Sequence, residues 1–348
     1  MRPSHISLIL DHELAGAGSG EHTPVMLWGP PGIGKSDLVR QAGVRHRVPV
    51  VDIRLSQMEP SDLRGIPFRT GEHVEWAVPS MLPDEVRHGA SGFLFLDELT
   101  SAVPSVSAAA YQLILDRRLG DYRVPPGWAI VAAGNRQGDR GISYTMPSPL
   151  ANRFSHYEIG VDVEDWAAWA YTHGIDERVI GFVRFRPDRL FHFDPADNPR
   201  AFPTPRSWEF VHRALRKYDR NPAVIGPAIE GCVGQGAAVE FQAFLASREA
   251  LPDIDRILAG ERPAPPEALD LQYALACALI SRAAGPTNTA APPGEICGRI
   301  LAYAVTLPQR EIAIMLVCDL VRVAGDHVME LPEFAPWADT VADILLYA

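Results

Sequence analysis

Short apolar runs alternate with polar, glycine-bearing segments over the first part of the chain. Such runs are typical of buried strands, and they predict strands at residues 25–28, 48–55, 93–96, 128–133 and 155–159. Helical patterns lie between these runs and predict a helix near the N-terminus and helices at 37–42 and 104–115. Strands that alternate with helices predict an α/β domain built on a parallel sheet, which we place at residues 1–160.

Two connections in this part differ from the rest. Residues 116–125 predict a hairpin with Gly120 and Asp121 at its turn. Residues 59–83 are polar and interrupted by proline and glycine, so we expect a long loop there. Loops of this length inside a compact domain often carry function.

Strand-like runs disappear after about residue 160, and helical patterns dominate the remainder. These patterns predict helices at residues 166–172, 178–184, 208–218, 222–231, 237–247, 269–283, 295–306, 310–324 and 337–347. A chain of 348 residues is longer than one hydrophobic core usually serves. We therefore expect a second, all-α domain at residues 161–348.

The segment after the first strand carries the strongest chemical signal. It reads G-x-x-x-x-G-K-S and lies between a predicted strand and a predicted helix, the context in which this pattern is a phosphate-binding P-loop. Its glycines let backbone N–H groups approach an anion. Lys35 would reach the β- and γ-phosphates, and the Ser36 hydroxyl would bind Mg²⁺. We expect the nucleotide to be bound by Gly29, Pro30, Pro31, Gly32, Ile33, Gly34, Lys35, Ser36 and Asp37.

Polar residues follow two of the predicted buried strands. Asp97 and Glu98 end the strand at 93–96, and Asn135 follows the strand at 128–133. Ligands of parallel sheets bind at the carboxyl ends of the strands. Asp97 would hold Mg²⁺ through water, and Glu98 would act as the general base on the attacking water. Asn135 could bind the γ-phosphate or that water, although a turn-forming role would also explain an asparagine there.

Two arginines stand at the ends of predicted helices. Arg153 precedes the last strand and could reach a γ-phosphate, in its own subunit or in a neighbour's, or lie on the surface. Thr204 can cap a helix whose first turn holds Pro205 and Arg206. A basic residue is unfavourable at that end of a helix dipole, so Arg206 could serve an external anion.

Composition narrows the class of protein. The hydrophobic fraction of 47% and the charged fraction of 22% are ordinary for a soluble globular protein. No apolar run approaches the roughly 18 residues that span a bilayer, and the N-terminus lacks the apolar core of a secretory signal. The four cysteines form no C-x-x-C pair, so we expect buried thiols in a reducing, cytoplasmic setting and no zinc. The net charge of −11 argues against nucleic acid as a partner, though not against a local basic pore.

These motifs, taken in order, resemble AAA+ ATPases. The similarity is greatest to the MoxR-type branch encoded beside von Willebrand factor A (VWA) domain proteins. It covers roughly residues 5–280 and is carried by residues 29–36, 62–65, 95–98, 133–135, 150–154 and 204–206. The helices after residue 295 exceed a minimal lid and depart from the family pattern.

The resemblance implies a three-layer AAA+ domain followed by a helical lid. Lys35 and Ser36 would belong to Walker A, Asp97 and Glu98 to Walker B, and Asn135 would be sensor 1. Arg153 would be a trans-acting arginine finger, and Arg206 would be sensor 2. It further implies ATP and Mg²⁺ as ligands, a homo-oligomeric ring that is usually a hexamer, and the remodelling of a protein partner, such as a VWA-domain protein. Two other functions stay open at this point: a nucleotide-gated binding module in a defence or signalling assembly, and an AAA+ nucleic-acid motor.

Overall fold

The computed structural model describes residues 1–136, 138–139, 144–194, 200–285 and 292–341. The chain divides into two compact units, Met1–Val161 and Asp162–Ala348. Among the described residues, no helix has both the length and the apolar character needed to cross a membrane. The four cysteines are free thiols, and burial raises the pKa of Cys277 to about 12.

The first unit is built on a five-stranded parallel sheet with the strand order β2-β5-β8-β1-β9. Its strands are β1 (Val25–Trp28), β2 (Val50–Arg54), β5 (Ser91–Asp97), β8 (Gly127–Gly134) and β9 (Ser155–Glu158). The three inner strands are apolar along most of their length because helices cover both faces of the sheet. The predicted α/β fold with a parallel sheet is confirmed.

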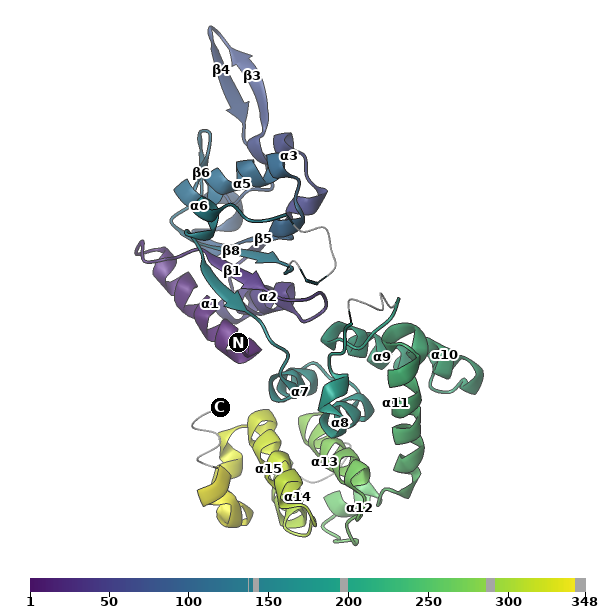
Figure 1. Ribbon diagram of the computed structural model, residues 1–348. Coiled ribbons are helices and arrows are strands. Elements are labelled where there is room, and N and C mark those ends of the chain that lie inside the picture. The colour runs from purple at the N-terminus through teal and green to yellow at the C-terminus, as the bar shows by residue number, and fades with distance from the viewer. Residues whose placement is uncertain (137, 140–143, 195–199, 286–291, 342–348) are drawn as a thin grey trace. The chain divides into compact units, whose positions relative to one another are not determined.

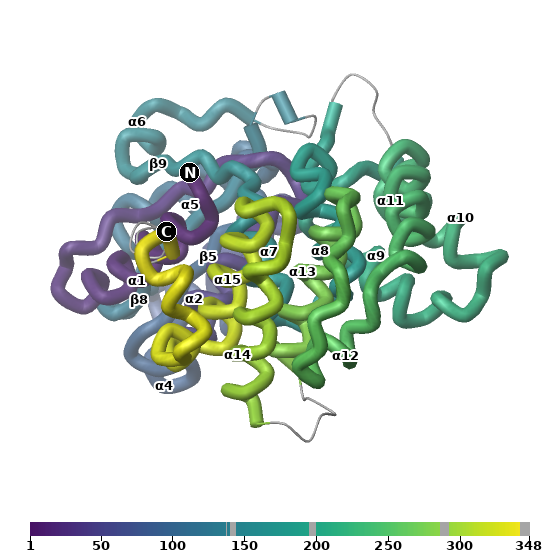
Figure 2. Tube along the Cα trace, turned by 90° about the horizontal axis from the view of Figure 1, so that it is seen from below, coloured from purple at the N-terminus to yellow at the C-terminus, as the bar shows by residue number. Residues whose placement is uncertain are grey.

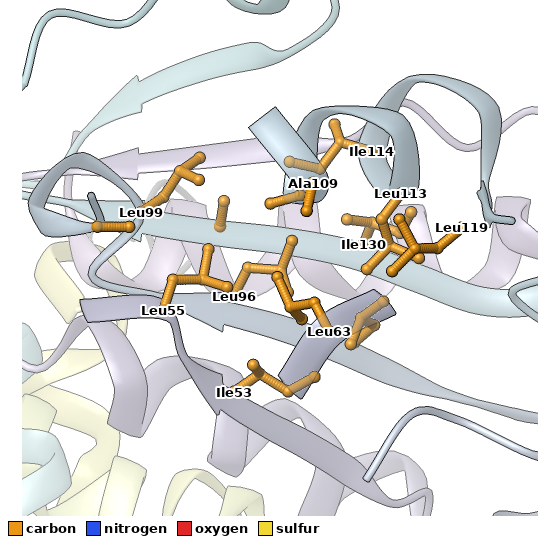
Figure 3. Close-up of a cluster of buried hydrophobic side chains, with 14 of the residues drawn as sticks. Ile53, Leu55, Leu63, Leu96, Leu99, Ala109, Leu113, Ile114, Leu119 and Ile130 are labelled. Atoms are coloured by element: carbon orange, nitrogen blue, oxygen red, sulfur yellow. The ribbon is translucent and has the colours of Figure 1, made fainter. Parts of the chain in front are cut away.

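Helices lie on both faces of this sheet (Figure 1). On one face are α1 (Pro3–Ala17) and α2 (Lys35–His46), and on the other are α5 (Pro104–Asp116) and α6 (Ser148–Ala151). The core between α5 and the sheet contains Leu96, Leu113 and Ile130, which are almost completely buried (Figure 3). This packing fixes the strand ends, and with them the side chains that follow the strands.

Residues 59–83 are not the loop that we expected. They form the short helix α3 (Pro60–Arg64) and an antiparallel hairpin of β3 (Ile66–Thr70) and β4 (His73–Ala77), which extends away from the body of the unit (Figure 1). All ten strand residues are exposed, so burial does not mark these strands, although apolar residues alternate along them at Ile66 and Phe68 and at Val74 and Trp76. Gly65 begins the hairpin at φ +85°, where a Cβ atom would lie 1.9 Å from the Ala77 carbonyl oxygen.

Two shorter elements complete the first unit. The helix α4 (Glu85–His88) has Asp84 as its N-cap, and the hairpin of β6 (Arg118–Leu119) and β7 (Tyr122–Arg123) turns at the predicted Gly120 and Asp121.

The second unit is helical throughout its described residues. Its helices are α7 (Val163–Thr172), α8 (Glu177–Phe185), α9 (Pro205–Tyr218), α10 (Pro222–Val233), α11 (Gln235–Ser247), α12 (Ile254–Leu258), α13 (Leu269–Ala284), α14 (Pro293–Ala304) and α15 (Arg310–Ala324). In Figure 2, α13 lies among α8, α14 and α15, and it packs against each of them. The prediction missed α12. Pro332–Trp337 forms a 3₁₀ helix that leads into α-helical residues 338–341, where the helix predicted at 337–347 was expected to begin, and residues 342–348 lie outside the described part.

Candidate nucleotide-binding site

The P-loop connects the end of β1 to the start of α2. Gly34 is the N-cap of α2 and has φ +99°, a conformation that glycine adopts without strain. A Cβ atom there would meet nothing within 4 Å, so the backbone conformation alone explains this glycine. The first N–H groups of α2 have no acceptor within the helix, and the helix dipole makes this end attractive to anions.

Lys35 lies buried at the centre of the site. Its Nζ donates to the carbonyl oxygens of Gly29 at 2.6 Å and Pro30 at 2.9 Å, and to Asn135 Oδ1 at 3.0 Å. The structure therefore brings together the lysine of the P-loop and the asparagine at the end of β8, which are 100 positions apart in the sequence. Asn135 is itself held by Thr100, whose Oγ1 accepts from the Asn135 N–H at 3.2 Å.

Ser36 and Asp97 form the second contact of the site. The Ser36 hydroxyl donates to Asp97 Oδ2 at 2.8 Å, and Asp97 is 9% exposed. A hydroxyl and a carboxylate oxygen side by side are ligands that Mg²⁺ prefers. Within the described ranges, no three His, Cys, Asp or Glu side chains gather as a metal site, so a magnesium ion here would also depend on phosphate and water oxygens.

Glu98 directly follows β5 and adopts a left-handed backbone conformation, with φ +57°. Its N–H donates to Asp97 Oδ1 at 2.9 Å, and its Oε2 accepts a hydrogen bond from the Ser56 hydroxyl. A glutamate at positive φ is uncommon, and such residues often cluster at functional sites. The conformation directs Glu98 to a different neighbour from Asp97, although the two are adjacent in sequence.

The structure describes the other predicted site residues within their own units. The Asp37 side chain is half exposed and pairs with Arg40 at 3.0 Å, so only its backbone N–H belongs to the P-loop end of α2. Arg153 is exposed in the turn after α6. Arg206 is exposed in the first turn of α9 in the second unit, where Thr204 caps the helix as predicted and accepts from the Ser207 N–H at 3.0 Å.

Sequence reasoning missed Ser56 and Thr100. Ser56 lies just after β2, and Thr100 lies three residues after Asp97. Neither belongs to a motif with fixed spacing. No sequence signal distinguishes either of them from other polar residues near strand ends.

The site residues of the first unit lie in a segment that matches a known protein family. Residues 24–154 match the AAA domain, dynein-related subfamily. This unit has the AAA+ fold. The matched segment runs from just before β1 to the turn that holds Arg153, and so contains every site residue of the first unit. An AAA domain implies ATP binding, and AAA proteins typically form oligomers.

Solved structures with similar folds include two of RuvB from Thermotoga maritima. The first is a RuvB mutant that is 17% identical to this chain with a TM-score of 0.40, and the match covers 80% of this chain and 82% of the RuvB chain. The second, described as a Holliday junction branch migration motor, is 15% identical with a TM-score of 0.37, over 79% of this chain and 81% of that one. A candidate ATPase from Cytophaga hutchinsonii is 13% identical with a TM-score of 0.32, over 97% of this chain and 88% of that one. Similarity this distant says nothing of what the AAA+ unit acts on.

Proposed function

We propose that this chain is an AAA+ ATPase that assembles into a ring, of the hexameric kind, and hydrolyses Mg-ATP. The ring uses the cycle of hydrolysis to remodel a protein partner such as a VWA-domain protein. The observation that carries the ATPase proposal is the convergence of Lys35, Ser36, Asp97 and Asn135 at the carboxyl edge of one parallel sheet. That edge is where ligands bind in such folds.

Each residue of the cluster has a role that its position supports. Bound Mg-ATP supplies the phosphoanhydride bond that water cleaves. The N–H groups at the start of α2 and the Lys35 ammonium bind the phosphates and offset their charge. Ser36 and Asp97 provide oxygen ligands to the metal, directly or through water.

Glu98 receives the proton of the attacking water in this proposal. Its Oε2 accepts from Ser56, and its backbone is fixed by the bond from its N–H to Asp97. Asn135 offers its amide to the γ-phosphate or the water, and Thr100 fixes its position. Arg153 serves the site of a neighbouring subunit, and Arg206 acts as sensor 2 on the helical lid.

Exposed apolar side chains on both faces of a hairpin support a protein partner. The hairpin of β3 and β4 exposes 68% of Ile66, 47% of Phe68, 65% of Val74 and 42% of Trp76. Apolar side chains gathered on an exposed element often mark a site of protein interaction. The net charge of −11 disfavours the alternative of a nucleic-acid motor.

The ATPase proposal predicts that one variant loses hydrolysis but keeps ATP binding, and that another loses ATP binding itself. Glu98→Gln should bind ATP with near-normal affinity but hydrolyse it about 10²–10⁴-fold more slowly, because a general base contributes a factor of this size. Lys35→Ala should lose ATP binding, because the phosphates lose their cation. Nucleotide binding and phosphate release with and without Mg²⁺ measure both effects. Hydrolysis by Glu98→Gln at the wild-type rate would show that another group is the base.

The partner is tested with the same trapped variant. Glu98→Gln in ATP should retain the protein partner that the wild type releases on hydrolysis, with Lys35→Ala as the control that cannot be trapped. Nucleic acid that stimulates turnover and binds in a salt-sensitive manner would instead favour the motor. Turnover too slow to accompany partner release would favour the nucleotide-gated binding module.

A further inference from the structure

A hydrogen-bonded bridge connects the strand before the P-loop to the turn that holds Arg153. Trp28 is the last residue of β1 and directly precedes Gly29. Its indole Nε1 donates to His156 Nδ1 at 2.9 Å. His156 lies on the edge strand β9, and its Nε2 donates to the Ala151 carbonyl oxygen at 2.8 Å. Ala151 is the last residue of α6, two positions before Arg153.

The chemistry of the bridge permits a single arrangement of protons. An indole N–H can only donate, so His156 Nδ1 must accept, and Nε2 must then carry the proton that goes to Ala151. The imidazole also stacks on the Trp28 ring at 5.9 Å between centroids and meets the Phe154 ring edge-on at 6.0 Å. Its orientation is therefore set by two hydrogen bonds and two rings.

The turn that holds Arg153 is fixed from both sides. Leu150 and Phe154 flank it and are buried, with 2% and 8% of their surface exposed. The Arg153 N–H donates to the Leu150 carbonyl at 3.0 Å, and the Phe154 N–H donates to the Ala151 carbonyl at 3.2 Å. The Ala151 carbonyl oxygen thus accepts from both the turn and His156.

We propose that His156 is a positioning residue that holds Arg153 in the orientation in which it serves a neighbouring subunit, and that Trp28 connects this hold to the P-loop strand. The inference rests on the proposed role of Arg153 and adds a residue that the motifs do not contain. Loss of the imidazole removes one of the two donors to the Ala151 carbonyl and leaves only the Phe154 N–H to hold this side of the turn. The P-loop, which makes its own contacts through Lys35 and Ser36, stays intact.

The first test separates the defect from simple misfolding. His156→Ala should lower kcat about tenfold and leave the ATP affinity of the same subunit unchanged, because small misplacements of a catalytic group are costly. His156→Gln, whose amide can still donate to Ala151, should recover much of the loss. Tyr157→Phe, on the same strand, is the control and should behave as wild type. A wild-type kcat for His156→Ala, or equal losses for His156→Ala and His156→Gln, would overturn the proposal.

The second test decides whether His156 serves the nucleotide site of its own subunit or that of a neighbouring subunit. His156→Ala subunits mixed with Lys35→Ala subunits should regain turnover, because the Lys35→Ala subunits cannot bind ATP but offer a correctly held Arg153. Arg153→Ala subunits mixed in the same way are the reference. Recovery with Arg153→Ala but not with His156→Ala would place the defect in the subunit's own P-loop and overturn the inference. Full activity of Arg153→Ala, or no recovery in its mixture, would instead refute the proposed role of Arg153.

Discussion

His22 is a buried histidine whose protonation state follows from its two hydrogen bonds. Its Nε2 accepts from the Ile130 N–H on β8 at 2.8 Å, so its proton lies on Nδ1, which contacts Glu13 Oε2 at 2.8 Å. Burial lowers the pKa of His22, although the Glu13 carboxylate opposes this shift. The neutral imidazole therefore connects the end of α1 to the centre of the sheet.

This histidine makes stability depend on pH. Its folded pKa lies below the unfolded value of 6.5, so its contribution is complete above pH 6.5 and is lost as the pH falls through the folded pKa. The free energy of unfolding should fall by up to about 1.4 kcal/mol per pH unit in that window. Urea unfolding of wild type and His22→Gln between pH 8 and 5 measures the difference. A constant difference in stability between wild type and His22→Gln across the range would contradict the assignment.

Residues of the site differ in how far the sequence could predict them. Lys35, Ser36 and Asp97 belong to motifs whose spacing reflects one local structure, and the structure brings Lys35 to Asn135 as the strand order requires. Ser56 and His156 reach the site region through the pairing of separate strands. Nothing local in the sequence distinguishes them from other surface residues, so only the fold reveals them.

A buried network of charges connects three helices of the second unit. Arg184 on α8 donates to Asp319 on α15 at 2.6 and 2.8 Å and to Glu164 on α7 at 2.6 Å. The side chains of Arg184 and Asp319 are each 1% exposed. Ions removed from water this completely need their partners, because desolvation is otherwise uncompensated.

Removal of one partner should therefore be strongly destabilising. Asp319→Ala leaves Arg184 buried without its nearest carboxylate and should cost about 3–5 kcal/mol in the free energy of unfolding. Asp255→Ala removes an exposed pair with Arg282, 68% and 49% exposed, and should cost no more than about 1 kcal/mol. Chemical denaturation compares the two variants. Similar costs for both would show that the buried network contributes little to stability.

Elements could be predicted from the sequence where burial is continuous. The strands β5 and β8 and the helix α5 lie in the core, where the strands are continuous apolar runs and the buried residues of α5 recur at helical spacing. The strands β3 and β4 bury nothing, and their apolar alternation covers only two residues in each strand, within a segment interrupted by proline and glycine. So short a pattern does not distinguish a hairpin from the loop that we expected.

The exposed Arg153 has a consequence for the whole molecule. No ion pair or hydrogen bond of its side chain occurs among the residues that the structure describes. If it completes a neighbour's site, turnover per subunit should rise with protein concentration as rings assemble and then reach a plateau. Phosphate release measured beside sedimentation over the same concentrations tests this. Wild-type turnover by monomers would contradict a shared site.

The hairpin of β3 and β4 allows one part of the molecule to diverge while the rest stays constant. The exposed side chains of the two strands contribute nothing to the core, and the exit of the chain into β3 depends on Gly65. Mutations in these strands therefore cost little in folding, whereas mutations at Lys35 or Asp97 would disable the site. Over evolutionary time, descendants of this chain could acquire new binding specificities by changing the hairpin, and keep the nucleotide-binding machinery they inherited.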